Sequence, residues 1–216
     1  MENFSQEQIN SLTLRFKELE WYCLTNLTEH EKCLLEDGRP EEYDPSAYTH
    51  YGEFFLTLSG IKPCFLITNA AFPHFGEIIY DRVLRHLLPE LSGLFELFRV
   101  EHPNKLATAA HRTPQIVFIF TSRYHPKFPL IQELLMKPQQ VPIPVELLGK
   151  ALGYPVPSGD CTFCYVDETT TNELGVSCVV FEFTAREGFE KSIRMHFERC
   201  AAEFRKLGRV LTITRQ

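Results

Sequence analysis

Residues 115–121 read QIVFIFT, and this run decides the fold class. Consecutive apolar residues from Ile116 to Phe120 make both faces of an extended chain apolar. A strand that is apolar on both faces is typical of the centre of a sheet, because other parts of the fold cover each face. The run therefore predicts a central strand in the middle of the chain.

The segments around it divide into strand patterns and helix patterns. Strand-like runs lie at 162–166, 176–183 and 210–214, whereas 64–68 fits a strand or a buried turn. Apolar residues at helical spacing predict helices at 46–58, 76–88, 130–136, 145–152 and 187–207. The spacing of apolar residues between Leu91 and Phe98 predicts one more helix. The polar residues at 167–175 predict a turn.

Capping patterns predict where the N-terminal helices begin. Ser5 with Gln8, and Thr28 with Glu31, each place a hydroxyl at a helix N-terminus and a side-chain acceptor three residues later. Residues 1–37 are therefore expected to form a helical N-terminal segment. We expect this segment to dock on the core rather than to form a dimer contact.

Together these patterns predict an α+β fold. A helical first half is followed by strands and a long helix, so we expect a small mixed or antiparallel sheet packed by helices. The expected fold has a helical N-terminal segment and a long C-terminal helix. With 216 residues, and about 150 residues in a typical domain, the chain is expected to form one domain over residues 1–216.

The charge of the chain disfavours nucleic acid as a partner. The formal net charge is -6, whereas a protein that binds the phosphate backbone needs a basic surface. A local basic patch at Arg112, Arg123 and Lys127 could still hold a small anion.

Hydropathy and cysteine usage predict a cytoplasmic protein. No stretch reaches the roughly 18 uncharged apolar residues that span a membrane, and the N-terminus lacks the pattern of a secretory signal. The cysteine count, 7, is odd, and most of these residues lie in apolar runs where a free thiol behaves as a small buried hydrophobe. We therefore expect a reducing compartment and no membrane partner.

Three short motifs resemble a bacterial family of unknown function. They are TLSGIK at 57–62, SRYHP at 122–126 and LGYP at 152–155, which match in order the T-L-x-G-I-K, Y-R-P and L-G-Y-P motifs of that family. The resemblance covers residues 54–216, which it implies are the core. Because the family has no assigned activity, the resemblance draws attention to Lys62 and Tyr154 without naming a reaction.

The candidate ligand-binding residues are Lys62, Arg123, His125 and Tyr154. Arg123 and His125 follow the carboxyl end of the central strand, a favoured position for groups that bind ligands. A guanidinium suits bidentate contact with a carboxylate or phosphate, so the set predicts a site for a small anionic ligand. The alternative is that Arg123 and His125 are solvated loop residues and that Gly153 and Tyr154 only end a helix.

Cys161 and Cys164 form a C-x-x-C pattern, in which the chain departs from the family it resembles. Such a pair can be a redox dithiol or half of a zinc site. The pair lies at the start of a predicted strand, where residues three apart point to opposite faces, and the sequence has no second close pair. The alternative is two half-buried cysteines of a strand.

These observations support three hypotheses for the function. The first is a non-catalytic binding or interaction protein, because the sequence contains no catalytic motif and is rich in Phe and Tyr. The second is an enzyme or small-molecule binder with an anion site near Lys62, Arg123 and His125. The third is a thiol redox or metal site at Cys161 and Cys164. The patterns assign no cofactor and no oligomeric state.

Overall fold

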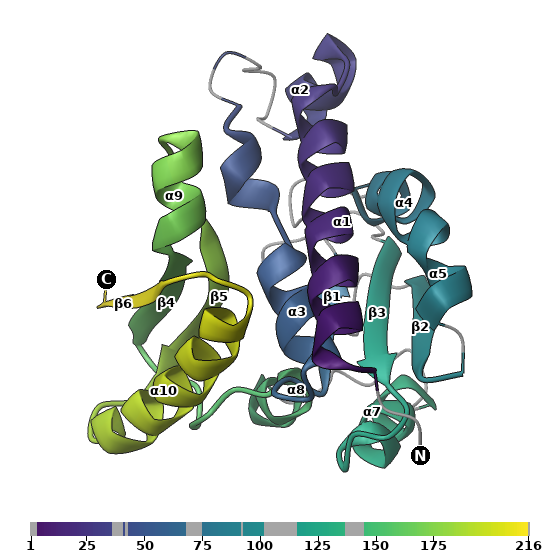
Figure 1. The fold of residues 1–216 in the computed structure, drawn as a ribbon. Helices are drawn as coiled ribbons and strands as arrows, with labels where there is room; N and C mark the ends of the chain where they lie inside the picture. Colours follow the sequence, from purple (N-terminus) through teal and green to yellow (C-terminus); the bar gives the residue numbers. More distant parts are fainter. Residues whose placement is uncertain are drawn as a thin grey trace.

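The fold is α+β, as predicted, with two small antiparallel sheets (Figure 1). The structure is a computed structural model that describes residues 4–35, 41, 43–67, 75–91, 93–101, 116–136 and 145–215. Arg112, part of the predicted basic patch, lies outside the described residues. The two sheets lie on opposite sides of helices α1 (Gln6–Thr25) and α3 (Tyr51–Leu58) (Figure 1).

The first sheet has the strand order β1-β3-β2. Its strands are β1 (Cys64–Ile67), β2 (Phe95–Glu101) and β3 (Ile116–Ser122). The central strand predicted from QIVFIFT is confirmed as β3, and the run at 64–68 contributes a strand rather than a buried turn.

The predicted helix between Leu91 and Phe98 is wrong. Helix α5 (Arg85–Leu91) ends before Gly93, whose φ of +90° is a backbone conformation that favours glycine. From Phe95 onward the chain pairs with β3 along the whole length of β2. Pairing with β3 therefore overrides a helical spacing that the residues also satisfy.

The second sheet has the strand order β5-β4-β6. Its strands are β4 (Cys161–Asp167), β5 (Val179–Ala185) and β6 (Leu211–Arg215). Phe163 lies opposite Phe183, and Tyr165 lies opposite Phe181, which makes one face of this sheet aromatic. The long C-terminal helix α10 (Glu190–Lys206) packs on this face.

The turn predicted between β4 and β5 is a short helix, α9 (Glu168–Leu174). Its threonines and asparagine are weak helix formers, so its ends decide the conformation. The Asp167 side chain accepts the N–H of Thr170 at 3.0 Å, and Gly175 closes the helix with a φ of +75°.

The remaining helices cover the sheets or connect them. They are α1 (Gln6–Thr25), α2 (Glu29–Leu35), the 3₁₀ helix η2 (Pro45–Tyr48), α3 (Tyr51–Leu58), α4 (Phe75–Ile79), the π-helix η3 (Tyr80–Leu84), α7 (Phe128–Met136) and α8 (Val145–Leu152). Both capping boxes predicted for the N-terminal helices are confirmed. Among the described helices, none combines the length and the apolar character needed to cross a membrane.

Helix α1 docks on α3, which lies between the two sheets (Figure 1). Phe16 of α1 stacks on Phe54 of α3 with ring centres 4.4 Å apart. Phe54 in turn contacts Phe120 of β3, whereas Phe55 contacts Phe204 of α10. Buried side chains from each sheet and from α1 therefore belong to one cluster.

Gly52 allows α3 to approach β5 closely. A Cβ at Gly52 would lie 2.2 Å from the Cβ of Val180, well inside van der Waals contact.

We expect Gly52→Ala to lower the free energy of unfolding by about 2 kcal/mol, because helix and strand must separate in a packed core. Urea unfolding measures the loss. Glu18→Ala on the exposed face of α1 is the control, with an expected change below about 0.5 kcal/mol; an equal effect of both substitutions would contradict the close packing.

Candidate functional site

Lys62 is buried and its charge is neutralised inside the protein. Its backbone N–H donates to the carbonyl oxygen of Leu56 at 2.9 Å, in a turn that Gly60 allows with a φ of +70°. The side chain is 1% exposed, and its Nζ forms an ion pair with Glu53 of α3. The same nitrogen lies 4.0 Å from the ring centre of Phe181, a cation–π contact.

Tyr154 lies beside Lys62, after the end of α8. Its ring is centred 5.9 Å from that of Phe181, which also contacts Lys62. Burial, together with the negative charges of Glu53 and Glu182, raises the pKa of the Tyr154 hydroxyl to about 12. The hydroxyl is therefore protonated at neutral pH and lies within the field of both carboxylates.

Arg123 and His125 lie elsewhere, beyond the end of β3. The Arg123 guanidinium forms an ion pair with Glu96 at 2.8 Å. The Nδ1 atom of His125 accepts the backbone N–H of Lys127 at 3.1 Å, and burial, with the charge of Lys127, lowers the pKa of His125. His125 lines a different hollow from Tyr154. The structure thus brings Lys62 and Tyr154 together but does not assemble the predicted four-residue anion site.

Cys161 and Cys164 point to opposite faces of β4. Cys161 lies opposite Ala185 in the register, and Cys164 lies opposite Glu182. The Cys164 thiol is buried 3.3 Å from a carboxylate oxygen of Glu182, and burial raises its pKa to about 11. Such a thiol is a poor nucleophile. Within the described residues, no group of three or more His, Cys, Asp or Glu side chains could hold a metal ion.

A cleft of about 710 Å³ lies where α3, β5, β1 and the end of α8 meet. We call it the acidic cleft, because the residues that line it include Asp44, Glu53 and Glu182, together with Tyr154. The rest of the lining comes from Ser46, Thr49, His50, Leu66, Leu152, Ser177, Val179, Val180 and Phe181. The volume is typical of a ligand site.

Internal hydrogen bonds fix one end of the acidic cleft. The Oδ1 atom of Asp44 accepts the backbone N–H of Ser46 at 2.9 Å, which caps η2. The buried carboxylate of Glu20 accepts the backbone N–H groups of His50 and Tyr51 at 2.7 and 3.0 Å, which caps α3. Burial raises the pKa of Glu20. The polar groups at this end therefore occupy defined positions.

No sequence motif marks the acidic cleft. Asp44, Glu53 and Glu182 come from separate parts of the chain, and none belongs to a motif. One signal was present: Glu182 is the single charged residue in the apolar run of β5, and it is exposed. A charge in the middle of a strand that is otherwise apolar indicates a solvent-facing position.

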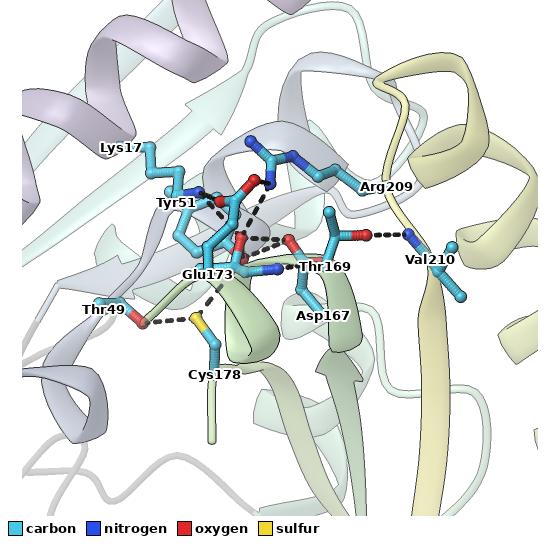
Figure 2. A network of polar contacts seen from close by, with 10 residues as sticks. Lys17, Thr49, Tyr51, Asp167, Thr169, Glu173, Cys178, Arg209 and Val210 are labelled. Carbon is cyan, nitrogen blue, oxygen red and sulfur yellow. Dashed lines mark hydrogen bonds and ion pairs between the residues drawn. The ribbon is translucent and has the colours of Figure 1, made fainter. Parts of the chain in front are cut away.

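A second group of polar residues joins α1, α3, α9 and the segment before β6 (Figure 2). This polar network consists of Lys17, Thr49, Tyr51, Asp167, Thr170, Glu173, Cys178 and Arg209. Asp167 is fully buried and accepts the hydroxyls of Tyr51 and Thr170, each at 2.7 Å. Lys17 and Arg209 both reach Glu173 at the surface end. We interpret the network as a structural connection between the N-terminal helix and the second sheet.

Comparison of the chain with family models, curated proteins and solved structures finds no match. The resemblance of residues 54–216 to the bacterial family therefore stays a prediction.

Proposed function

We propose that this protein is a non-catalytic binding protein whose acidic cleft takes a positively charged ligand. The observation that carries the proposal is that three acidic residues, Asp44, Glu53 and Glu182, line one cleft. Lys62 neutralises Glu53 from the interior, so Asp44 and Glu182 set the negative charge of the cleft. A cation placed there is attracted by both carboxylates, and the ring of Tyr154 adds a cation–π surface.

The structural roles of the cleft residues favour binding over catalysis. Asp44 caps η2, Glu53 pairs with Lys62, and His50 is hydrogen-bonded to Glu20. Groups held in this way form a rigid, preorganised surface, which lowers the cost of binding a ligand. The internal carboxylate partners of Lys62 and Arg123 argue in the same way against the alternative of an anion site.

Glu182→Gln tests the proposal. We expect the variant to bind a capped lysine tetrapeptide about fivefold more weakly than the wild type, a loss of about 1 kcal/mol, because one exposed charge partner is removed. Isothermal titration calorimetry measures the affinity, and binding should weaken as the salt concentration rises.

Glu198→Gln is the matched control. This residue is exposed on α10 and does not line the acidic cleft, yet the substitution makes the same change in charge. The control should bind like the wild type. Equal losses in both variants, or equally tight binding of a glutamate tetrapeptide, would overturn the proposal.

We also propose a cytoplasmic location. All seven cysteines are free, and Cys23, Cys64, Cys178 and Cys200 are buried hydrophobic positions. Unpaired thiols are typical of a reducing compartment.

A further inference from the structure

We infer that two copies of this chain pair along the free edge of β6 and form a symmetric dimer. Strand β6 is the last strand of the second sheet, and within the described residues it pairs with β4 alone. The acidic cleft borders β5, at the opposite edge of the same sheet. The dimer contact is therefore independent of the proposed function.

The backbone of β6 presents polar groups at this edge. The N–H of Glu168 donates to the carbonyl oxygen of Val210 at 2.9 Å, so Val210 directs its backbone groups toward β4. Successive residues of a strand direct their backbone groups to alternate sides, and the register between β4 and β6 is regular, so Ile213 and Arg215 direct theirs away from β4. Neither residue has another backbone partner in the part of the chain that the structure describes. An unpaired row of this kind is a template for an added strand.

An apolar hollow lies beside this edge, between β6 and α10. Its volume is about 340 Å³, and the residues that line it include Phe163, Ile193, Phe197 and Ile213. Ile213 lies on the face of the sheet that α10 covers, because it is opposite Tyr165, whose ring contacts Phe197. Ile213 is nevertheless 38% exposed. The free edge is therefore bordered by apolar surface that a second copy would cover.

The sequence of β6 is complementary to itself in an antiparallel pair. With a twofold axis at Ile213, the N–H and C=O groups of this residue bond to those of Ile213 in the second copy, and the two side chains lie side by side. Thr212 then lies opposite Thr214 of the second copy, a cross-strand pair that stabilises sheets. Arg215, the one charged residue of β6, lies opposite Leu211 of the second copy. No like charges therefore face each other between the two strands.

The charges of α10 favour the same arrangement. Arg194 and Glu198 line the hollow, about one helical turn apart. His196, midway between them, contacts Tyr165, which lies opposite Ile213, so the twofold axis passes near the level of His196. Two copies of α10 related by this axis run antiparallel, which directs Arg194 of each copy toward Glu198 of the other. A second copy thus meets matching backbone groups, apolar surface and opposite charges, as a self-complementary twofold interface requires.

Sedimentation equilibrium of the full chain between about 1 and about 300 µM tests the dimer. We expect a reversible monomer–dimer equilibrium with a dissociation constant inside this range, because a contact built on one short strand is small. Ile213→Lys places two ammonium groups opposite each other at the axis, so we expect it to weaken dimerisation at least about hundredfold. Met195→Lys is the matched control. Met195 is an exposed apolar residue of α10 that does not line the hollow, so this variant should dimerise like the wild type.

Hydrogen exchange gives a readout that needs no substitution. In the wild type, exchange at the Ile213 amide should slow at least about threefold from the dilute to the concentrated sample, because this N–H bonds to the second copy in the dimer. A chain that stays monomeric over the whole range, which would leave the edge to a strand of another protein, would overturn the inference. So would a dimer that Ile213→Lys leaves as tight as the wild type, or one in which exchange at Ile213 does not change.

Discussion

Replacing Asp167 by alanine should lower the free energy of unfolding by about 4 kcal/mol. The carboxylate caps α9 through the backbone N–H of Thr170, and that contribution is worth about 1 kcal/mol. It also accepts two buried hydroxyls, those of Tyr51 and Thr170. Without Asp167, these two hydroxyl donors lose their acceptor in the interior, at about 1–3 kcal/mol for each unsatisfied group.

Two further variants at the polar network provide the comparison. Asp167→Asn keeps the shape and one acceptor oxygen, so its loss should fall between zero and that of Asp167→Ala. Glu173→Gln changes a half-exposed ion pair at the other end of the network, where we expect less than about 1 kcal/mol. Urea unfolding at constant pH measures all three variants. If Asp167→Ala cost no more than Glu173→Gln, Asp167 would not be the centre of the network.

The elements that were predictable from sequence are those with local signals. The capping side chains of Ser5 and Thr28 contact backbone groups three residues away, so their geometry is local and the sequence contains it. Strand β3 was recognisable because it lies between β1 and β2 at the centre of its sheet, a position for which an apolar run without alternation is typical.

The elements that were mispredicted depend on partners that are distant in sequence. The residues from Leu91 to Phe98 fit a helix by spacing, yet β3 offers a full row of backbone partners to β2. Gly93, with its positive φ, is a local signal that ends the preceding helix. In α9 the composition favours a turn, but Asp167 and Gly175 together cap a helix.

The candidate site likewise has one part that the sequence indicated and another part that depends on residues distant in sequence. The interest in Lys62 and Tyr154 came from motifs, and the two residues do meet at Phe181. Their environment was not predictable, because Glu53 and Glu182 reach it from a helix and a strand that are far apart in sequence. The sequence also could not show that Lys62 points inward, since a buried lysine depends on a partner supplied by the fold.

Protonation of His196 should destabilise the protein in mild acid by on the order of 3 kcal/mol relative to a non-titrating variant. His196 lies on α10 against the aromatic face of the second sheet, where its Nδ1 lies 3.1 Å from the Tyr165 hydroxyl. Burial, together with the positive charges of Arg199 and Lys62, lowers the pKa of His196 to about 4.

The direction of the effect follows from this shift. The unfolded chain binds a proton at His196 near the ordinary pKa of 6.5, whereas the folded protein does not bind it until about pH 4. Stability that is present above pH 6.5 is therefore lost as the pH falls toward 4. His196→Gln keeps an acceptor for the Tyr165 hydroxyl but cannot take up the proton, so its stability should fall less over this range.

Urea unfolding between pH 7.5 and 4.5 measures the difference. The control is His30→Gln, because His30 is exposed on α2 and should leave the pH dependence of the wild type unchanged. Parallel stability curves for the wild type and His196→Gln would show that the imidazole titrates alike in the folded and unfolded chain, which would contradict its burial against Tyr165. A curve for His196→Gln that is flatter by the expected amount would locate the acid sensitivity at the contact between α10 and the second sheet, on the same aromatic face whose Phe181 ring also contacts Lys62 and Tyr154.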